Sequence, residues 1–444
     1  MPALHDRHDL AVSTRDAAAV DAFERALAAL QGGRGSVDPH VDAALRREPS
    51  CVIAHCLRAT GRLLNGDLAH DPHVGAALAA LDRWLGHANE RERAHAAALR
   101  AWHRGEARAA LDLYDALLVA HPRDGLALRA AHALDFRLGQ REMMRDRVAR
   151  VLPHWHPSLP GYGYVLGMYA FGLEETGDYA RAEALARRAL EAAPDNAAAM
   201  HVIAHVLEMQ GRAREGVAWL EATRAVWRES AYAIHNAWHL ALFHLDRDAP
   251  AAALAIHDEV LRPPAASATS ALIDGSALLW RLVLRGVDVE NRFRALASAW
   301  RGKVLRGARA FTLAHAVMAL AAAGDAAGAR SVAALLREDR ATRKANLSED
   351  LALAVPFCEA LCAFAGGDYA RAVDRLSAVR ARAEHCGGSI AQCDLIHLTF
   401  VESALRGRHT PLAQALAAER RARRPASRLN RWLFARAGAM LQVA

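Results

Sequence analysis

The stretch PDNAAAMHVIAHVLEMQGRAREGVAWLEATRAVW, residues 194–227, contains two segments with apolar residues at helical spacing, one on each side of Gly211. Between Pro194 and Gly211, alanine, valine and leucine recur at helical spacing, and the same pattern continues from Gly211 to Trp227. Glycine at the junction supplies a backbone conformation that other residues resist. The stretch therefore predicts a helix, a tight turn and a second helix.

A related phrase recurs along the chain. GDYARA occurs at residues 177–182 and again at 367–372, and looser copies of the unit begin at residues 104, 248 and 324. The period and the phrase resemble the tetratricopeptide repeat. One helix pair cannot bury its apolar stripe alone, so neighbouring pairs must stack. We therefore predict an all-α fold, a tetratricopeptide-repeat-like right-handed superhelical solenoid of antiparallel helix pairs.

The same pattern sets the expected domain organisation. Helical units resume directly after each Pro- or Gly-rich interruption, such as PHWHPSLPGYGY at 153–164. We therefore expect one continuous helical-repeat solenoid over residues 1–444. We expect residues 1–15, MPALHDRHDLAVSTR, to form a flexible N-terminal segment.

Composition limits the class of protein. With 53% hydrophobic and 24% charged residues, the chain is globular rather than disordered. Its formal charge is +7, but the basic residues are nearly all arginines scattered among acidic residues, which does not favour a nucleic-acid partner. The densest basic stretch, RRARRPASR at 420–428, is expected to be a solvated helix end.

Cysteine usage and the apolar runs bear on location. The six cysteines form no C-x-x-C pair, and the N-terminal segment has no apolar core of a signal peptide. The longest apolar runs are far too short to span a bilayer. These features predict a soluble, cytoplasmic protein with reduced, mostly buried thiols and no membrane partner.

Several stretches are similar, in order, to the tetratricopeptide repeat protein 38 family and its bacterial relatives. They include AMHVIAHVLEMQGRAREG, AIHNAWHLALF and GGSIAQCDLIHL, and the likeness extends along nearly the whole chain. The resemblance implies a soluble helical-repeat protein and assigns no activity. The chain departs from the family pattern at Cys393, where arginine is more usual, whereas Asp394 fits it.

Histidines and a carboxylate gather on the predicted groove of this solenoid. With Gly211 as the turn glycine, His201, His205 and Glu208 fall at positions of the first helix that line the concave face in tetratricopeptide repeats. The next unit adds three residues from HNAWH to the same face: His235, Trp238 and His239. The preceding unit adds two: Glu174 and Tyr164.

Three interpretations of this cluster remain open. The histidines could be buried and each satisfied by one hydrogen bond, although so many converging polar groups would strain an apolar core. They could line a pocket that binds a small polar molecule or a peptide. They could also hold a divalent metal such as zinc or iron, since His-x-x-x-His places two imidazoles one helical turn apart.

These interpretations lead to three function classes. The first is a binding solenoid with a His-rich concave pocket for a small polar ligand or a peptide. The alternative is a metal-dependent enzyme acting on a small polar substrate, with His201, His205, His235 and His239 as candidate ligands and Glu208 as a ligand or general base. The third is a scaffold that uses the groove without chemistry. Oligomeric state does not follow from the sequence.

A weaker candidate follows the Gly-Gly turn of CGGSIAQCDLIH. Asp394 lies in the first turns of a helix there, where backbone N–H groups could hold an anion. The alternative is an ordinary helix N-cap made by Ser389.

Overall fold

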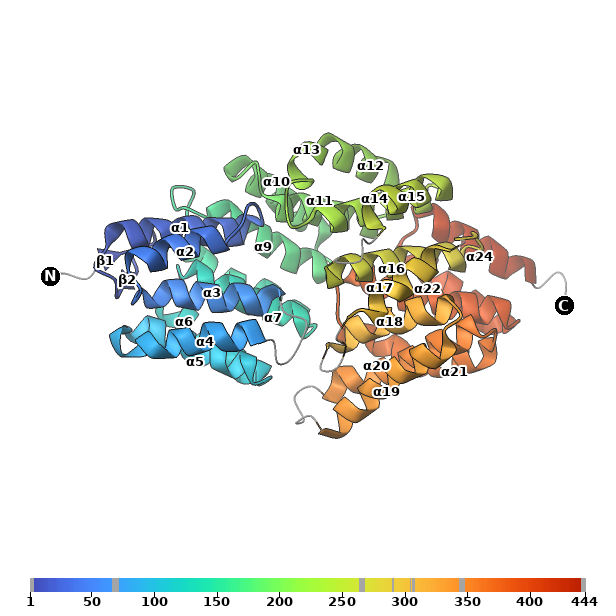
Figure 1. Cartoon of the computed structure of the whole chain (residues 1–444). Helices are drawn as coiled ribbons and strands as arrows, with labels where there is room; N and C mark the ends of the chain where they lie inside the picture. Colours follow the sequence, from blue (N-terminus) through green and yellow to red (C-terminus); the bar gives the residue numbers. More distant parts are fainter. Residues whose placement is uncertain are drawn as a thin grey trace. The chain divides into compact units, whose positions relative to one another are not determined.

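The computed structural model describes residues 4–262, 268–289, 291–303, 305, 308–342 and 348–440, apart from residues 66–71. Among these residues the protein is built almost wholly of helices, packed as antiparallel pairs joined by short turns (Figure 1). The described residues divide into two compact units, 1–203 with 225–232, and 204–224 with 233–444. The prediction of an all-α solenoid of antiparallel helix pairs is confirmed.

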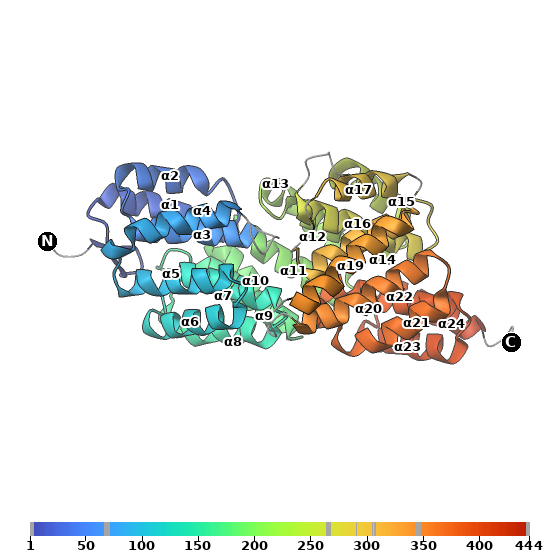
Figure 2. The same cartoon turned by 60° about the horizontal axis from the view of Figure 1, so that its bottom comes forward.

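The first unit opens with a short hairpin and continues as helix pairs. Helices α5 to α8 run side by side in sequence order, as Figure 2 shows. Its strands and helices are β1 (Leu4–His5), β2 (Ala11–Val12), α1 (Ala17–Gly32), α2 (Asp38–Arg47), α3 (Val52–Asn65), α4 (Pro72–Trp84), α5 (Glu90–His103), α6 (Ala107–Ala120), α7 (Gly125–Arg137), α8 (Arg141–Val151), α9 (Tyr162–Glu175) and α10 (Tyr179–Ala192).

Helix α11 (Ala197–Met209) runs from the first unit into the second, and the short α13 (Arg224–Trp227) also lies at the division. The second unit contains α12 (Ala213–Ala222), α14 (Ala233–Asp246), α15 (Pro250–Ile256), α16 (Thr269–Leu284), α17 (Arg292–Arg301), α18 (Ala310–Ala322), α19 (Ala326–Thr342), α20 (Ser348–Ala365), α21 (Tyr369–Val379), α22 (Ile390–Arg406), α23 (Thr410–Arg423) and α24 (Arg428–Ala439).

The two GDYARA phrases form the same turn. Gly177 and Gly367 adopt φ angles of 86° and 79°, in the left-handed region that favours glycine. The aspartate that follows each glycine caps the next helix. The Asp178 side chain accepts a hydrogen bond from the backbone N–H of Arg181, and the Asp368 side chain accepts one from the backbone N–H of Arg371. The phrase therefore fixes where one helix ends and its partner begins.

Helices α12 and α14 of the second unit approach each other closely. At Gly216 on α12, an added Cβ would lie 2.3 Å from the ring of Phe243 on α14. Phe243 is almost fully buried, so its ring has little room to move away. The missing side chain at Gly216 thus lets α14 pack directly on α12, and α14 carries two of the candidate histidines.

The N-terminal segment contains a short β-hairpin. Residues 1–3 lie outside the described part, but within the stretch 1–15, expected to be flexible, β1 and β2 pair as an antiparallel hairpin. The Asp6 side chain accepts hydrogen bonds from the backbone N–H groups of His8 and Leu10, which closes the turn. The expectation of one continuous unit over residues 1–444 stays a prediction beside the two compact units.

Most of the six cysteines are buried. Cys51, Cys56, Cys358, Cys386 and Cys393 are buried, and Cys362 is partly buried. Burial raises the pKa of the Cys51 thiol to about 12 and that of Cys56 well above its usual value. These thiols are therefore protonated and unreactive while the surrounding helices stay closed.

Candidate functional site

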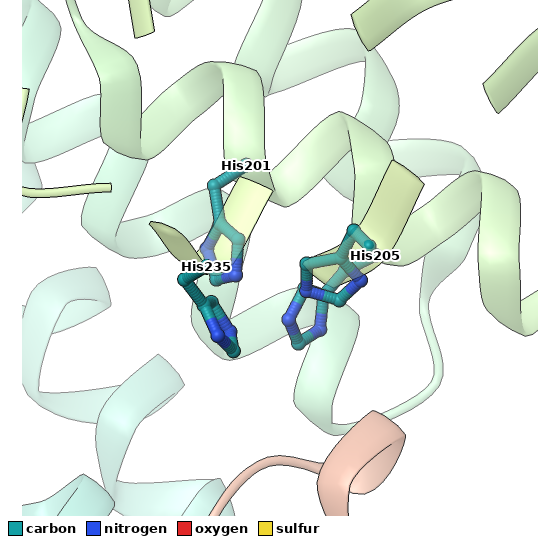
Figure 3. Close-up of side chains that lie close together, drawn as sticks. His201, His205 and His235 are labelled. Atoms are coloured by element: carbon teal, nitrogen blue, oxygen red, sulfur yellow. The ribbon is translucent and has the colours of Figure 1, made fainter. Parts of the chain in front are cut away.

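Three candidate histidines come together within the second unit. His205 on α11 and His239 on α14 are fully buried, and His235, one turn before His239, is about one fifth exposed. One ring nitrogen from each of the three lies within 4.8 Å of the others. Figure 3 shows His205 and His235 extending from their two helices toward one another. We call His205, His235 and His239 the histidine cluster.

Carboxylates hold two of the three rings. Nδ1 of His239 lies 2.8 Å from Oε2 of Glu208, and Nδ1 of His235 lies 2.9 Å from Oδ2 of Asp274 on α16. A carboxylate accepts, so Nδ1 of each ring donates, and in the neutral ring this leaves the lone pair on Nε2. The carboxylates therefore fix both the orientation and the tautomer of the two rings.

Ring contacts complete the cluster. The centroid of His239 lies 4.6 Å from that of His205 and 4.9 Å from that of His235. The Trp238 ring stacks on His235 at 5.1 Å with an interplanar angle of 11° and meets His239 edge-on at 4.8 Å. Trp238 thus forms an apolar wall on one side of the histidines.

Burial and neighbouring charges set the protonation of the cluster. Burial, reinforced by His205 and His235, lowers the pKa of His239 well below its usual value, which keeps the ring neutral. Burial also acts against the charged form of His235, but the charge and hydrogen bond of Asp274 outweigh it and raise the pKa of that ring. Burial raises the pKa of Glu208 despite the nearby charge of Arg424.

The other predicted residues of the cluster belong to the first unit by their contacts. His201 lies one turn before His205 on α11, and its ring packs 5.9 Å from Phe171 and 5.2 Å from Tyr232. Glu174, at the end of α9, is fully buried. Burial raises the pKa of Tyr164, which is half-buried near the start of the same helix. Whether these three residues take part in a site stays a prediction.

Asp394 has a different environment from the one suggested by its place after the Gly-Gly turn. Its oxygens accept two hydrogen bonds from Arg420, at 2.7 and 3.1 Å, and Arg424 lies 3.7 Å away. Although burial acts against its charge, these arginines hold the pKa of Asp394 well below its usual range. The N-cap by Ser389 is confirmed, since its hydroxyl accepts a hydrogen bond from the N–H of Gln392.

The structure corrects the expectation that RRARRPASR, 420–428, is a solvated helix end. Arg421 and Arg423 are exposed, but Arg420 is only 6% exposed and the Arg424 side chain 12%. Both turn inward because Asp394, on the neighbouring helix α22, offers a buried carboxylate. Their inward direction depends on that partner, 26 residues away from Arg420 in the sequence.

A pocket adjoins the histidine cluster within the same unit. It encloses about 690 Å³ of empty space, open solvent included, and Glu208 lines it. Sequence reasoning missed Asp274, Arg281, Arg420 and Arg424 as functional candidates. The sequence did contain one sign of a buried cation, because Arg281 is a single arginine inside the apolar run SALLWRLVL of α16.

A second His-carboxylate group, in the first unit, has a structural explanation. The side chains of Asp6, His8 and Glu24 lie together. Asp6 closes the N-terminal turn, Nε2 of His8 lies 2.9 Å from the carbonyl oxygen of Pro160, and Glu24 accepts a hydrogen bond from the backbone N–H of Arg7. These bonds tie the N-terminal hairpin to the first unit and leave no reason to assign a ligand.

Comparison with a family model supports the repeat class over part of the chain. A family model described as "Tetratricopeptide repeat" matches residues 173–234. Among solved structures, the chain is similar to a monomeric mutant of IFIT1 with Gppp-AAAA, at 14% identity and a TM-score of 0.44, covering 95% of this chain and 94% of that one. It is also similar to the human IFIT1 dimer with m7Gppp-AAAA, at 15% identity and a TM-score of 0.39, with the same coverage. No described helix has the length and apolar character needed to cross a bilayer.

Proposed function

We propose that this chain is a ligand-binding helical-repeat protein whose histidine cluster holds a divalent transition-metal ion. The observation that carries the proposal is the pair of carboxylate-bound imidazoles, His239 with Glu208 and His235 with Asp274. Metal-binding histidines characteristically donate their second ring nitrogen to a carboxylate, which orients the ring and makes the ligand nitrogen more basic. The same bonds would also satisfy two buried rings in a core without a ligand, so metal analysis separates the two interpretations.

The spacing of the rings supports the same assignment. Two imidazoles bound to one zinc ion at about 2.0–2.1 Å have centroids roughly 4.5–5.2 Å apart, for bond angles between a right angle and the tetrahedral value. The separations of 4.6 Å for His205 and His239, and 4.9 Å for His235 and His239, lie in that range. Nitrogen donors suit zinc and iron better than magnesium or calcium.

The residues of the cluster and their carboxylate partners have different roles in the proposed site. His205, His235 and His239 would supply three nitrogen ligands, and His201 stays a candidate ligand on the sequence pattern alone. Glu208 and Asp274 orient the rings, so Glu208 acts through His239. When bound, the ion would act as a Lewis acid toward a polar group of the ligand. Trp238 excludes water from one side.

Metal analysis of untagged protein tests this proposal. We expect close to one zinc or iron per chain in the wild type and its loss in the variant His235→Ala/His239→Ala. His244→Ala is the matched control, because His244 lies on α14 but outside the histidine cluster. Asp274→Asn should weaken metal binding about 10- to 100-fold, because it loosens the orientation of His235.

A negative result would be equally clear. If the purified wild type carries no metal and its metal-free form gives no cobalt(II) absorption bands on titration, the cluster is not a metal site. If the double variant keeps the metal of the wild type, the ion is bound elsewhere.

A metal-dependent enzyme is the second candidate function. The specific observation in its favour is that Glu208 both binds His239 and lines the adjoining pocket, so a substrate in the pocket would lie beside the cluster. Metal-dependent hydrolysis of a p-nitrophenyl ester panel, lost in His235→Ala/His239→Ala and kept in His244→Ala, would favour it. Equal rates for the wild type and the double variant would exclude it for these substrates.

Two finer expectations also stay proposals. The burial of five of the six cysteines supports a reducing, cytoplasmic location. The likeness to the tetratricopeptide repeat protein 38 family is likewise a proposal beyond the repeat class itself.

A further inference from the structure

The pocket beside the histidine cluster contains a buried arginine with no carboxylate partner. Arg281, on α16, is 5% exposed. Its Nη1 donates to the carbonyl of Ala277 at 3.2 Å and its Nη2 to that of Ala391 at 2.9 Å, and the guanidinium lies 5.1 Å from the centre of the Trp238 ring. It forms no ion pair with any carboxylate in the described part of the chain. A guanidinium has five N–H groups, so donors remain for a ligand.

Leaving this cation buried is costly. An unpaired charge in an apolar interior loses its hydration without compensation, and such groups are normally paired. The cost is visible as a pKa of about 10 for Arg281, lowered by burial although Asp394 and Glu208 act in the opposite direction. The side chain nevertheless stays charged at neutral pH.

The two carboxylates whose charges act on Arg281, Asp394 and Glu208, already have other partners. Asp394 accepts two hydrogen bonds from Arg420, and Glu208 binds His239. Arg424 lies 4.0 Å from Glu208 and 3.7 Å from Asp394. Three guanidinium groups thus accompany two carboxylates around this end of the pocket. This part of the pocket carries a surplus of about one positive charge.

Over the whole lining the formal charges balance, because four arginines accompany four carboxylates, so the surplus is local to Arg281, on which Asp394, Glu208, Arg424 and Arg420 act. Asp246 accepts hydrogen bonds from the Ser427 hydroxyl and the backbone N–H of Leu429. Arg285 pairs with Asp248. Glu402 forms ion pairs with Arg406 and Arg436.

The remainder of the lining is apolar. Five helices, α12, α14, α16, α22 and α24, contribute alanine, leucine or aromatic side chains. They include Leu242, Phe243, Leu284, Leu398, Trp432 and Leu433. A ligand that fills this space must therefore present a nonpolar body, while one polar end meets the arginines.

We propose that this pocket binds a small organic monocarboxylate with an apolar body, whose carboxylate is held by Arg281 together with Arg424. A planar carboxylate matches the paired N–H groups of a guanidinium. One negative charge balances the surplus, whereas a phosphate dianion would be repelled by Asp394 and Glu208. This inference does not rest on the metal ion, because no histidine of the cluster lines the pocket.

A purely structural role for Arg281 makes a different prediction. Its bond to the Ala391 carbonyl ties α16 to α22, and that contact alone would stabilise the unit without any ligand. In that case, replacing Arg281 changes stability but no carboxylate binds the wild type. Ligand binding, rather than stability, therefore separates the two roles.

Calorimetric titration of the metal-free, full-length protein at pH 8 provides the test, with octanoate, 1-octanol and octyl phosphate as probes. We expect octanoate to bind, 1-octanol to bind at least tenfold more weakly because it lacks the charge, and octyl phosphate to bind more weakly than octanoate. Arg281→Gln should weaken octanoate binding at least tenfold. Arg301→Gln, which removes one positive charge at an exposed ion pair outside the pocket, should leave it unchanged.

A second variant guards against a folding defect in Arg281→Gln. Leu398→Phe keeps every charge and narrows the apolar part of the pocket, so it should also weaken octanoate binding. The proposal is overturned if octanoate does not bind, if 1-octanol binds as tightly, if octyl phosphate binds more tightly, or if both pocket variants bind octanoate like the wild type. Since the metal-free protein is used, octanoate binding without any metal in the native protein would reject the metal proposal alone.

Discussion

The buried group around Asp394 gives the sharpest test of how the second unit is held together. Asp394→Asn keeps the shape of the side chain but removes the charge that Arg420 and Arg424 face. The variant leaves two buried guanidinium groups, beside the already unpaired Arg281, without their main anion. Removing one partner from a buried ion pair costs about 3–5 kcal/mol, and we expect the free energy of unfolding to fall by that amount at pH 7.

The same variant should change the response to acid. The folded-state pKa of Asp394 is far below the ordinary value of 3.8 because Arg420 and Arg424 face it, so its contribution to stability is fully present above pH 3.8 and is lost as the pH falls below that value. The difference in stability between wild type and Asp394→Asn should therefore be constant from pH 7 down to about pH 5 and then shrink.

Urea unfolding followed by tryptophan fluorescence, repeated from pH 3 to pH 7, measures both effects. Asp374→Asn is the control, because the Asp374 side chain is 75% exposed, and we expect it to behave like the wild type. A loss below about 1 kcal/mol for Asp394→Asn at pH 7 would show that the arginines find other partners or water. A difference that stays unchanged at pH 3 would refute the assigned charge state.

Three further substitutions test packing and capping through thermal unfolding midpoints. Gly216→Ala should destabilise by roughly 1–3 kcal/mol, because the new methyl group meets the Phe243 ring, and an unchanged midpoint would contradict the close approach. Gly61→Ala, on α3 with open space around it, should instead stabilise by up to about 1 kcal/mol, and a loss would show a hidden clash. Ser389→Ala should cost about 1 kcal/mol by removing the α22 cap, whereas Ser389→Thr should retain most of it.

Local signals were enough to predict the repeat architecture. Gly177 and Asp178 act within a few residues of themselves, through a left-handed turn and a helix cap, so the sequence around them determines the outcome. The stretch 194–227 similarly predicted α11, its turn at Gly211 and α12. The sequence did not reveal that the second helix stops at Ala222 and that the short α13 follows.

The candidate site was only partly accessible to the same reasoning. Helical spacing placed His235 and His239 on one face of α14, because that geometry is local. Their carboxylate partners could not be found this way: Asp274 is 39 residues from His235, and Glu208 is 31 residues from His239. Those pairs depend on which helices pack together. The inward turn of Arg420 escaped prediction for the same reason.

The buried cysteines have a practical consequence. Cys51 and Cys56 lie in the first compact unit and Cys358 lies in the second, and burial raises the pKa of all three thiols. A thiol that is shielded and protonated reacts with an alkylating reagent only during moments when its own surroundings loosen. Pulse alkylation followed by peptide mass spectrometry would thus measure the local opening of each compact unit separately, because native cysteines lie in both units and no label has to be introduced.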